Sequence, residues 1–279
     1  MITHFMGIEY GRGACATPRE GGPALGPHEV EKMFYDVKWT HIQPLPVDIA
    51  AGAVDRFAEN TPVQIDIYNK TPHERHIMIG GDHSVNFGHF SALADQLPND
   101  DLCLVYIDAH FDIHNPESSR AQASGAPHGC NVRALMGDGD PRWLAIQSKK
   151  PALKPENVFY LGVRSYEPAE IEFVRKQNIF VRHAHELQDM AAVRDAVAAV
   201  HEKLAGRPFV LSFDFDSIDP KYFSSVWVPA PNGISVDTAA YMIGAFRDAY
   251  GIEFVEYAPN GNAADADIVK QLVTIAKNQ

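Results

Sequence analysis

Short runs of almost uninterrupted apolar residues are the feature that most restricts the fold of this chain. They include CLVYI at residues 103–107, VFYLGV at 158–163 and FVLSF at 209–213. Such runs lack the alternating polarity of a half-exposed strand and are typical of strands that helices cover on both faces of a parallel sheet. The predicted strands lie at residues 4–10, 41–45, 75–79, 102–107, 157–163, 179–182, 209–213 and 253–257.

Helical patterns separate the predicted strands. In residues 190–204, Val193, Val197, Val200 and Leu204 are spaced to form one buried stripe. The predicted helices lie at residues 27–35, 85–96, 169–177, 190–204, 238–250 and 264–277. The alternation predicts an α/β protein with three α-β-α layers around a mostly parallel sheet of about eight strands.

Nothing in the sequence divides the chain into parts. It has no internal repeat, low-complexity tract or Gly/Ser linker, so we expect residues 1–279 to form a single domain. The 36 acidic residues outnumber the 24 Lys and Arg residues and give a formal net charge of -12. This balance argues against a nucleic-acid partner, because binding to phosphates requires clustered cations.

The sequence also lacks the features of a membrane or secreted protein. It has no run of about 18 apolar residues, the length that a membrane-spanning helix needs. Residues 1–11 show no signal-peptide pattern. Cys15, Cys103 and Cys130 are too few and too scattered for a disulfide framework. We therefore expect a cytoplasmic protein that does not interact with a membrane.

Three motifs rich in Asp and His lie at the ends of predicted strands. They are GGDHS at residues 80–84, DAHFD at 108–112 and DFDSIDP at 214–220. Long segments rich in Gly, Pro and polar residues occupy residues 112–127, 138–155 and 220–235. Ligands of parallel sheets bind beyond the carboxyl ends of the strands, so we expect the functional site where these motifs and loops meet.

The spacing within the motifs indicates a metal centre. In an extended chain, side chains two positions apart point the same way, which groups Asp108, His110 and Asp112, and likewise Asp214 and Asp216. Four carboxylates crowded together without a cation would repel one another and take up protons. Two divalent cations would balance the four charges. Manganese suits a mixed carboxylate and imidazole site, and iron, cobalt, nickel or zinc is compatible with it.

Each motif alone has an ordinary structural explanation. An Asp at the end of a strand commonly caps a helix or forms a turn, and a single His is more often a satisfied polar residue than a ligand. The three motifs together favour a joint cluster, in which His83 and His110 add nitrogen donors to the four carboxylates.

The motifs GGDHS, DAHFD and SFDFDSIDP resemble, in this order, three signatures of the ureohydrolase superfamily, and the chain looks closest to the arginases. The resemblance extends to a Gly/Pro-rich stretch at residues 19–27 and to FVEY at 254–257. It implies an arginase-like fold and two Mn(II) ions per subunit, with Ni(II), Co(II), Fe(II) or Zn(II) as alternatives. It also implies a homo-oligomer, usually a trimer or a hexamer, and a small guanidino substrate.

The resemblance assigns the metal ligands residue by residue. One metal would be held by His83, Asp108, Asp112 and Asp214. The other would be held by His110, Asp108, Asp214 and Asp216, so that two aspartates bridge the metals. The pair would activate a shared water, which attacks the guanidinium carbon and leads to the release of urea.

Three residues have catalytic roles in this resemblance. Asp112 would orient the attacking oxygen in addition to holding a metal. His128, in the sequence APHG, would pass a proton to the leaving nitrogen, a task for a group that titrates near neutral pH. Glu256 would bind the planar guanidinium cation through its carboxylate.

The resemblance places contacts to the rest of the substrate at His114, Asn115, Ser124 and Glu167. Glu167 matches an acidic residue that binds the α-amino group in arginases. The neighbouring Ser165 and Ala126 depart from the arginase pattern, which has Asp and Asn there. The loop at residues 223–233 also departs from it, because a Trp and a Val replace small residues.

We expect hydrolysis of L-arginine to L-ornithine and urea. Agmatine and guanidino acids such as 4-guanidinobutyrate are the alternative substrates. Formiminoglutamase activity is less favoured, because that class usually alters the Asp of GGDHS, which is present here as Asp82. A metal-binding scaffold without catalysis would not require His128 and Glu256. A zinc amide hydrolase of the deacetylase type uses one metal and is disfavoured by the paired Asp214 and Asp216.

Overall fold

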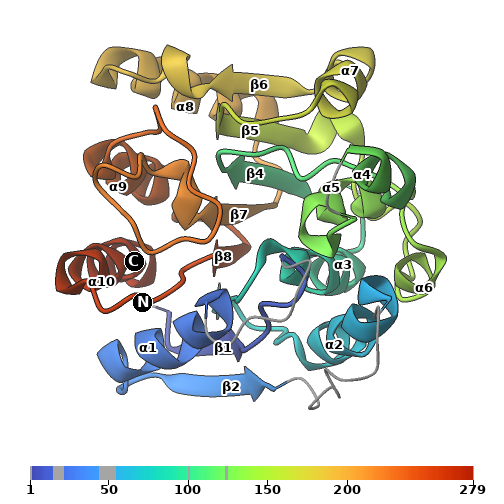
Figure 1. Ribbon diagram of the computed structural model, residues 1–279, viewed down its shortest axis with the longest axis horizontal. Helices are drawn as coiled ribbons and strands as arrows, with labels where there is room; N and C mark the ends of the chain where they lie inside the picture. Colours follow the sequence, from blue (N-terminus) through green and yellow to red (C-terminus); the bar gives the residue numbers. More distant parts are fainter. Residues whose placement is uncertain (1, 15–21, 44–54, 100, 123–124, 279) are drawn as a thin grey trace.

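The structure is a computed structural model that describes residues 2–14, 22–43, 55–99, 101–122 and 125–278. Its centre is one sheet (Figure 1), whose strands are β1 (His4–Ile8), β2 (Lys38–Ile42), β3 (Ile77–Ile79), β4 (Cys103–Ile107), β5 (Val158–Val163), β6 (Phe180–His183), β7 (Phe209–Asp214) and β8 (Gly251–Val255). The strand order is β2-β1-β3-β8-β7-β4-β5-β6, and all neighbours pair in parallel. The predicted parallel α/β sheet of about eight strands is confirmed.

All the predicted strands are present, with ends that differ by one to three residues. The sequence predicts a strand at 41–45, whereas β2 begins at Lys38, which pairs with His4 of β1, and residues 44 and 45 lie outside the described part of the chain. β2 lies at the edge of the sheet and its sequence KWTHI lacks the apolar run that marks the central strands. The strand predicted at 253–257 ends at Val255, because Glu256 has a φ of 62°, which is outside the strand region.

Helices cover both faces of the sheet. They are α1 (Gly26–Met33), α2 (Arg56–Lys70), α3 (Asn86–Gln96), α4 (Pro116–Gln122), α5 (Asn131–Leu135), α6 (Pro141–Leu144), α7 (Pro168–Lys176), α8 (Met190–Leu204), α9 (Val236–Ala245) and α10 (Ala263–Lys277). Figure 1 shows α1, α8, α9 and α10 on one face and α2 to α7 on the other. Apolar side chains from each helical layer pack on the sheet and form a separate core on each face. The three α-β-α layers are therefore confirmed.

α2 is absent from the predicted helices, and its buried face explains why. The face contains polar residues that break the apolar pattern, and Pro62 lies inside the helix. Asn60 donates a hydrogen bond to the Ser84 hydroxyl at 2.9 Å, and Gln64 donates one to the Ser84 carbonyl at 2.9 Å. This helix therefore packs on the GGDHS turn through hydrogen bonds rather than through an apolar stripe. The short helices α4, α5 and α6 are also absent from the predicted set.

The helices of the described residues are all too short or too polar to cross a membrane.

A buried chain of polar groups joins the start of β3 to α3 and β8. The Nε2 atoms of His76 and His89 lie 2.7 Å apart, and His89 Nδ1 lies 2.5 Å from an oxygen of Glu253. One of the two facing nitrogens must accept the hydrogen bond, because two N–H groups cannot donate to each other. His76 is fully buried, and burial together with the nearby His89 lowers the pKa of His76 to about 3.

We predict that this histidine makes the fold sensitive to acid. Its folded pKa lies below the ordinary value of 6.5, so its contribution to stability is complete above about pH 6.5 and is lost as the pH falls toward 3. His76→Gln keeps an acceptor for His89 and should flatten the decline of unfolding free energy by up to about 1.4 kcal/mol per pH unit. Urea unfolding of chelated protein at several pH values measures this slope.

The matched control is His28→Gln, since the His28 side chain is 59% exposed. It should leave the slope unchanged. Equal slopes for His76→Gln and the unaltered protein would contradict the assignment.

Candidate metal centre

The carboxyl ends of three strands near the middle of the sheet bring the sequence motifs together. β4 leads into Asp108 and His110, and β7 ends at Asp214 and continues into the short helix Phe215–Ser217, which contains Asp216. β3 leads through two glycines into the short helix His83–Val85. These strands, with β8 between β3 and β7, are neighbours in a parallel sheet, so their carboxyl ends share one edge.

The six predicted ligands form two adjoining groups. The first surrounds His83, whose Nδ1 lies 3.0 Å from Asp108 Oδ2, 3.0 Å from Asp214 Oδ2 and 3.4 Å from Asp112 Oδ2. The second surrounds His110, whose Nδ1 lies 3.4 Å from Asp108 Oδ1 and 3.1 Å from Asp216 Oδ2. Asp108 belongs to both groups, with one carboxylate oxygen in each.

Backbone and neighbouring side chains hold these carboxylates in place. The amides of His110 and Asp216 donate to Asp108 and Asp214 at 2.6 and 2.7 Å, which locks each side chain to the turn that follows its strand. The other ring nitrogen of His83, Nε2, lies 2.9 Å from the Ser212 hydroxyl on β7. A hydrogen bond to the second nitrogen orients a ligating imidazole.

The charges of the cluster suit bound cations. Burial, followed by the charges of Asp216 and Asp108, raises the pKa of Asp214 well above its ordinary value. Burial likewise raises the pKa of Asp216, although His110 opposes the shift. Asp108 Oδ2 is buried, and apart from the His83 ring nitrogen 3.0 Å away it has no partner among the described residues. Four buried aspartates and two imidazoles fit two divalent cations.

Asp112 is held by an unusual backbone conformation. Its φ is 49°, the left-handed region that non-glycine residues rarely adopt. Tyr106 and Asn131 donate hydrogen bonds to its Oδ2 at 2.9 and 3.2 Å. Burial, followed by the charge of Asp108, raises the pKa of Asp112 to about 6. With this backbone conformation, the carboxylate lies 3.4 Å from His83 Nδ1.

Glu256 and His128 lie beside the first group. Glu256 also has a left-handed backbone, and its Oε1 accepts a hydrogen bond from the His83 amide at 2.9 Å. His128 Nδ1 lies 3.4 Å from the same oxygen. Burial lowers the pKa of His128, but the hydrogen bond to Glu256 and the charges of Asp112 and Glu256 outweigh it and raise the pKa to about 9.

Glu256 keeps one oxygen available. Its Oε2 is buried and has no hydrogen-bond partner within the described part of the chain. A buried carboxylate oxygen without a donor is costly unless a ligand supplies one.

His114 and Glu167 lie together, and Glu170 joins them. His114 Nε2 is 3.1 Å from Glu167 and 3.6 Å from Glu170. Burial, followed by the hydrogen bond to Glu167, raises the pKa of Glu170 to about 9, so Glu170 is the protonated member of this carboxyl pair at neutral pH. The pKa of Glu167 is lowered, chiefly by the hydrogen bond from Glu170. The cluster therefore presents the charge of Glu167, whose side chain is 48% exposed.

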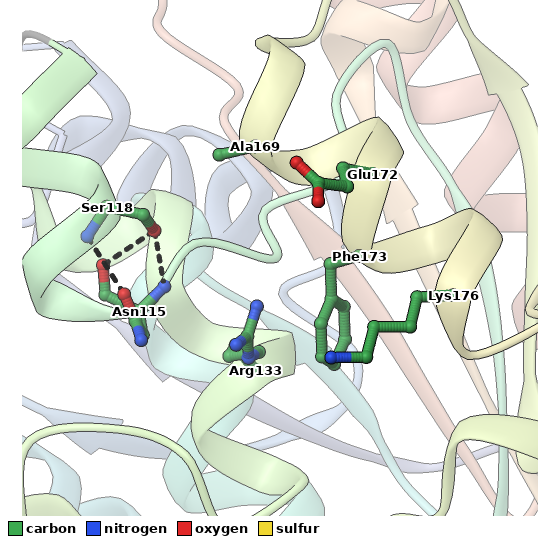
Figure 2. A pocket seen from close by; sticks show the side chains of 7 residues that line it. All are labelled: Asn115, Ser118, Arg133, Ala169, Glu172, Phe173 and Lys176. Carbon is green, nitrogen blue, oxygen red and sulfur yellow. Dashed lines mark hydrogen bonds between the residues drawn. The ribbon is translucent and has the colours of Figure 1, made fainter.

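Asn115 faces a separate cavity of about 220 Å³ that Figure 2 shows from close by. Its side-chain oxygen accepts a hydrogen bond from the Ser118 amide, and its nitrogen donates to Asp138 at 3.3 Å. The cavity lies between the start of α4, α5 and α7 and includes Arg133 and Phe173. The structure therefore does not bring Asn115 into the His114 cluster. Ser124 lies outside the described residues.

Several residues of the site are absent from the sequence predictions. Glu170 follows Glu167 at the spacing of a helix capping box, and that spacing is a signal that could have identified it. Tyr106 and Ser212 lie inside apolar strands, where the sequence marks them only as core residues.

Comparisons with known proteins all find similarity to arginases. A family model described as the Arginase family matches residues 15–276. The arginase of Entamoeba histolytica is 29% identical over 188 residues, which cover 66% of this chain and 62% of that protein. The arginase of Bacillus caldovelox is 31% identical over 189 residues, which cover 66% of this chain and 61% of that protein. The matches therefore span less than two thirds of these relatives.

A solved structure shows the same fold. The Entamoeba histolytica arginase in complex with L-ornithine superposes with a TM-score of 0.87 and 23% identity, covering 99% of this chain and 98% of that chain.

We predict that Asp214→Asn separates the cost of the carboxylate cluster from the gain of cation binding. Without metal, burial and the neighbouring charges already disfavour ionisation of Asp214, so a neutral Asn in its place should leave the protein at least as stable as the unaltered one. It should lose most of the stabilisation by Mn(II), which amounts to about 2.7 kcal/mol per site when the free ion exceeds its Kd about 100-fold. Melting temperatures with chelator and with Mn(II) measure both effects.

The control is Asp66→Asn, because Asp66 is half exposed and pairs with Lys70 on the surface. It should retain the full response to Mn(II). A large loss of stability in chelated Asp214→Asn, or a full response to Mn(II), would exclude this account of the cluster.

Proposed function

Because the chain belongs to the arginase family, we propose that it is a metal-dependent hydrolase that cleaves a guanidino C–N bond and releases urea, with L-arginine as the substrate. The observation that carries the proposal is the free Oε2 of Glu256, buried beside two groups of cation ligands. A guanidinium is a planar cation whose N–H groups match such a carboxylate.

The ligands proposed for the first cation are His83, Asp108, Asp112 and Asp214. Those proposed for the second are His110, Asp108, Asp214 and Asp216. When bound, a pair of divalent cations supplies Lewis acidity and lowers the pKa of water toward neutrality. We propose Mn(II) because carboxylates outnumber imidazoles in this set.

Three side chains of the protein bind the substrate, orient the water and transfer the proton. Glu256 binds the guanidinium and is itself held by the His83 amide, so the substrate carbon is fixed relative to the ligand cluster. Asp112, held by Tyr106 and Asn131, accepts a hydrogen bond from the attacking water and orients it. His128 is half-buried, and its Nδ1 lies near Glu256. We assign it the proton transfer to the leaving nitrogen.

The substrate tail is proposed to reach the cluster of His114, Glu167 and Glu170. The ionised Glu167 suits the α-amino group, because Glu170 takes up the proton that the pair shares. His114 is retained as a predicted contact, although its Nδ1 lies 3.0 Å from the Ser118 hydroxyl and its Nε2 lies 3.1 Å from Glu167. We retain Ser124 and Asn115 as predicted contacts, with Asn115 the weaker candidate since it bonds to Asp138.

A panel of guanidino compounds tests the substrate. With Mn(II) bound, L-arginine should give the highest kcat/KM for urea release, at least about tenfold above agmatine and 4-guanidinobutyrate, since each lacks one charged group of the tail. Equal rates with arginine and agmatine would contradict recognition of the carboxylate. If the protein binds two ions but releases urea from none of the tested guanidino compounds, it would be a metal-binding scaffold.

We predict that His128→Asn retains both cations and lowers kcat by about 100-fold or more, because only proton transfer is lost. Elemental analysis of the desalted protein and urea release measure the two properties. His185→Asn is the control, because His185 is exposed, and it should be fully active. A loss of bound metal in His128→Asn would instead make His128 a ligand.

Two further properties accompany the proposal. The homo-oligomer, a trimer or hexamer, and the cytoplasmic location stay predictions from the sequence and its family resemblance.

A further inference from the structure

Arg164 is placed where the two loops that contain cation ligands meet. It directly follows β5, the neighbour of β4, and β5 approaches the ligand loop closely. Gly162, with a φ of 102°, allows this approach, because a Cβ there would lie 3.2 Å from the Asp108 carbonyl oxygen. The backbone amide of Arg164 donates to the Ala109 carbonyl at 2.9 Å. Ala109 separates Asp108 from His110.

The guanidinium of Arg164 binds the other ligand loop. It donates to the carbonyl oxygens of Asp216 at 2.7 Å and Ser217 at 3.0 Å. One residue therefore attaches to the backbone beside His110 and to the backbone of Asp216. The two loops are also joined directly, because the Ala109 amide donates a hydrogen bond to Asp216 Oδ1 at 3.3 Å.

The same guanidinium also holds the loop at residues 220–235. It donates to the carbonyl of Ala230 at 2.7 Å and to that of Pro231 at 3.2 Å. Gly233 leaves room for it, since a Cβ at Gly233 would lie 2.5 Å from the guanidinium nitrogen. A guanidinium has five N–H donors in a rigid planar fork for these converging carbonyls, whereas a Lys ammonium has three.

Arg164 bonds to backbone oxygens and leaves the ligand carboxylates free. Burial lowers the pKa of Arg164, and the charges of Asp216, Asp108, Asp219 and Asp214 oppose that shift. The guanidinium therefore adds a positive charge behind the cluster without competing for the oxygens that a cation would use.

We propose that Arg164 is a positioning residue for the second cation site, formed around His110 and Asp216. The proposal rests on the two-cation site of the proposed function. The Arg164 guanidinium holds the backbone of Asp216 and Ser217 at this site, and it makes no hydrogen bond to His83 or Asp112. Its loss should weaken the second site and spare the first.

Calorimetric titration of Mn(II) into metal-free Arg164→Lys tests this difference. The affinity of the second site should fall at least about tenfold, the effect typical of losing a group that orients ligands, and that of the first should stay within about twofold. His110→Asn, which removes a ligand of the second site, identifies which titration step belongs to it.

The matched control is Arg207→Lys. Arg207 also donates to backbone carbonyls, those of Leu204 and Lys203 at 3.1 and 2.7 Å, but it precedes β7 and so lies at the opposite end of the sheet. It should lower the melting temperature without changing either Mn(II) affinity. Unchanged affinities in Arg164→Lys, or an equal loss at both sites, would overturn the proposal.

A second variant covers the case in which Arg164→Lys does not fold. Gly233→Ala keeps Arg164 but places a methyl group 2.5 Å from its guanidinium nitrogen and within 2.7 Å of the Asp219 amide and the Ser217 carbonyl, so it disturbs the contact between Arg164 and the Asp216 loop and should weaken the same site selectively. Unaltered Mn(II) binding by folded Gly233→Ala would then overturn the proposal. Failure of the unaltered protein to bind two ions would instead refute the two-cation site, so the two failures are distinguishable.

Discussion

The mutual repulsion of buried carboxylates is the constraint on which the rest of this structure depends. Asp108, Asp112, Asp214 and Asp216 lie within one buried cluster, where ionised groups are costly. The parallel sheet accommodates them because the ends of neighbouring strands supply backbone amides as donors. The fold thus holds in place four neighbouring carboxylates, whose repulsion His83 and His110 offset in part and bound cations would relieve further.

Much of this organisation could be predicted from the sequence, because its signals are local. Uninterrupted apolar runs identified the central strands, and the spacing of Asp and His identified the side chains that the structure brings together in two groups. The edge strand β2 and helix α2 were harder to predict, because their own patterns of polar and apolar residues do not indicate a strand or a helix. Contacts with neighbouring segments determine both elements. Arg164 gives no signal in the sequence, because its importance lies in carbonyl groups contributed by other segments.

Backbone strain was equally invisible to sequence patterns. Asp112 and Glu256 both adopt left-handed conformations, although neither residue type marks such a position. Both side chains are turned toward His83 by this geometry. Strain of this kind costs on the order of 1–3 kcal/mol per residue and persists where the surrounding structure compensates for it. Here the compensation comes from Tyr106 and Asn131 for Asp112, and from the His83 amide for Glu256.

The strand order has a consequence for how the chain acquires its ions. Strands β8 and β7, which come late in the chain, lie between β3 and β4. His83 and Asp214 are 131 positions apart, and His83 and Glu256 are 173 apart. Because such distant segments meet slowly, a polypeptide still leaving the ribosome contains no complete chelating pocket. Under the proposed function, incorporation of the ions would therefore be confined to the finished fold, and a truncated translation product would lack the full set of ligands.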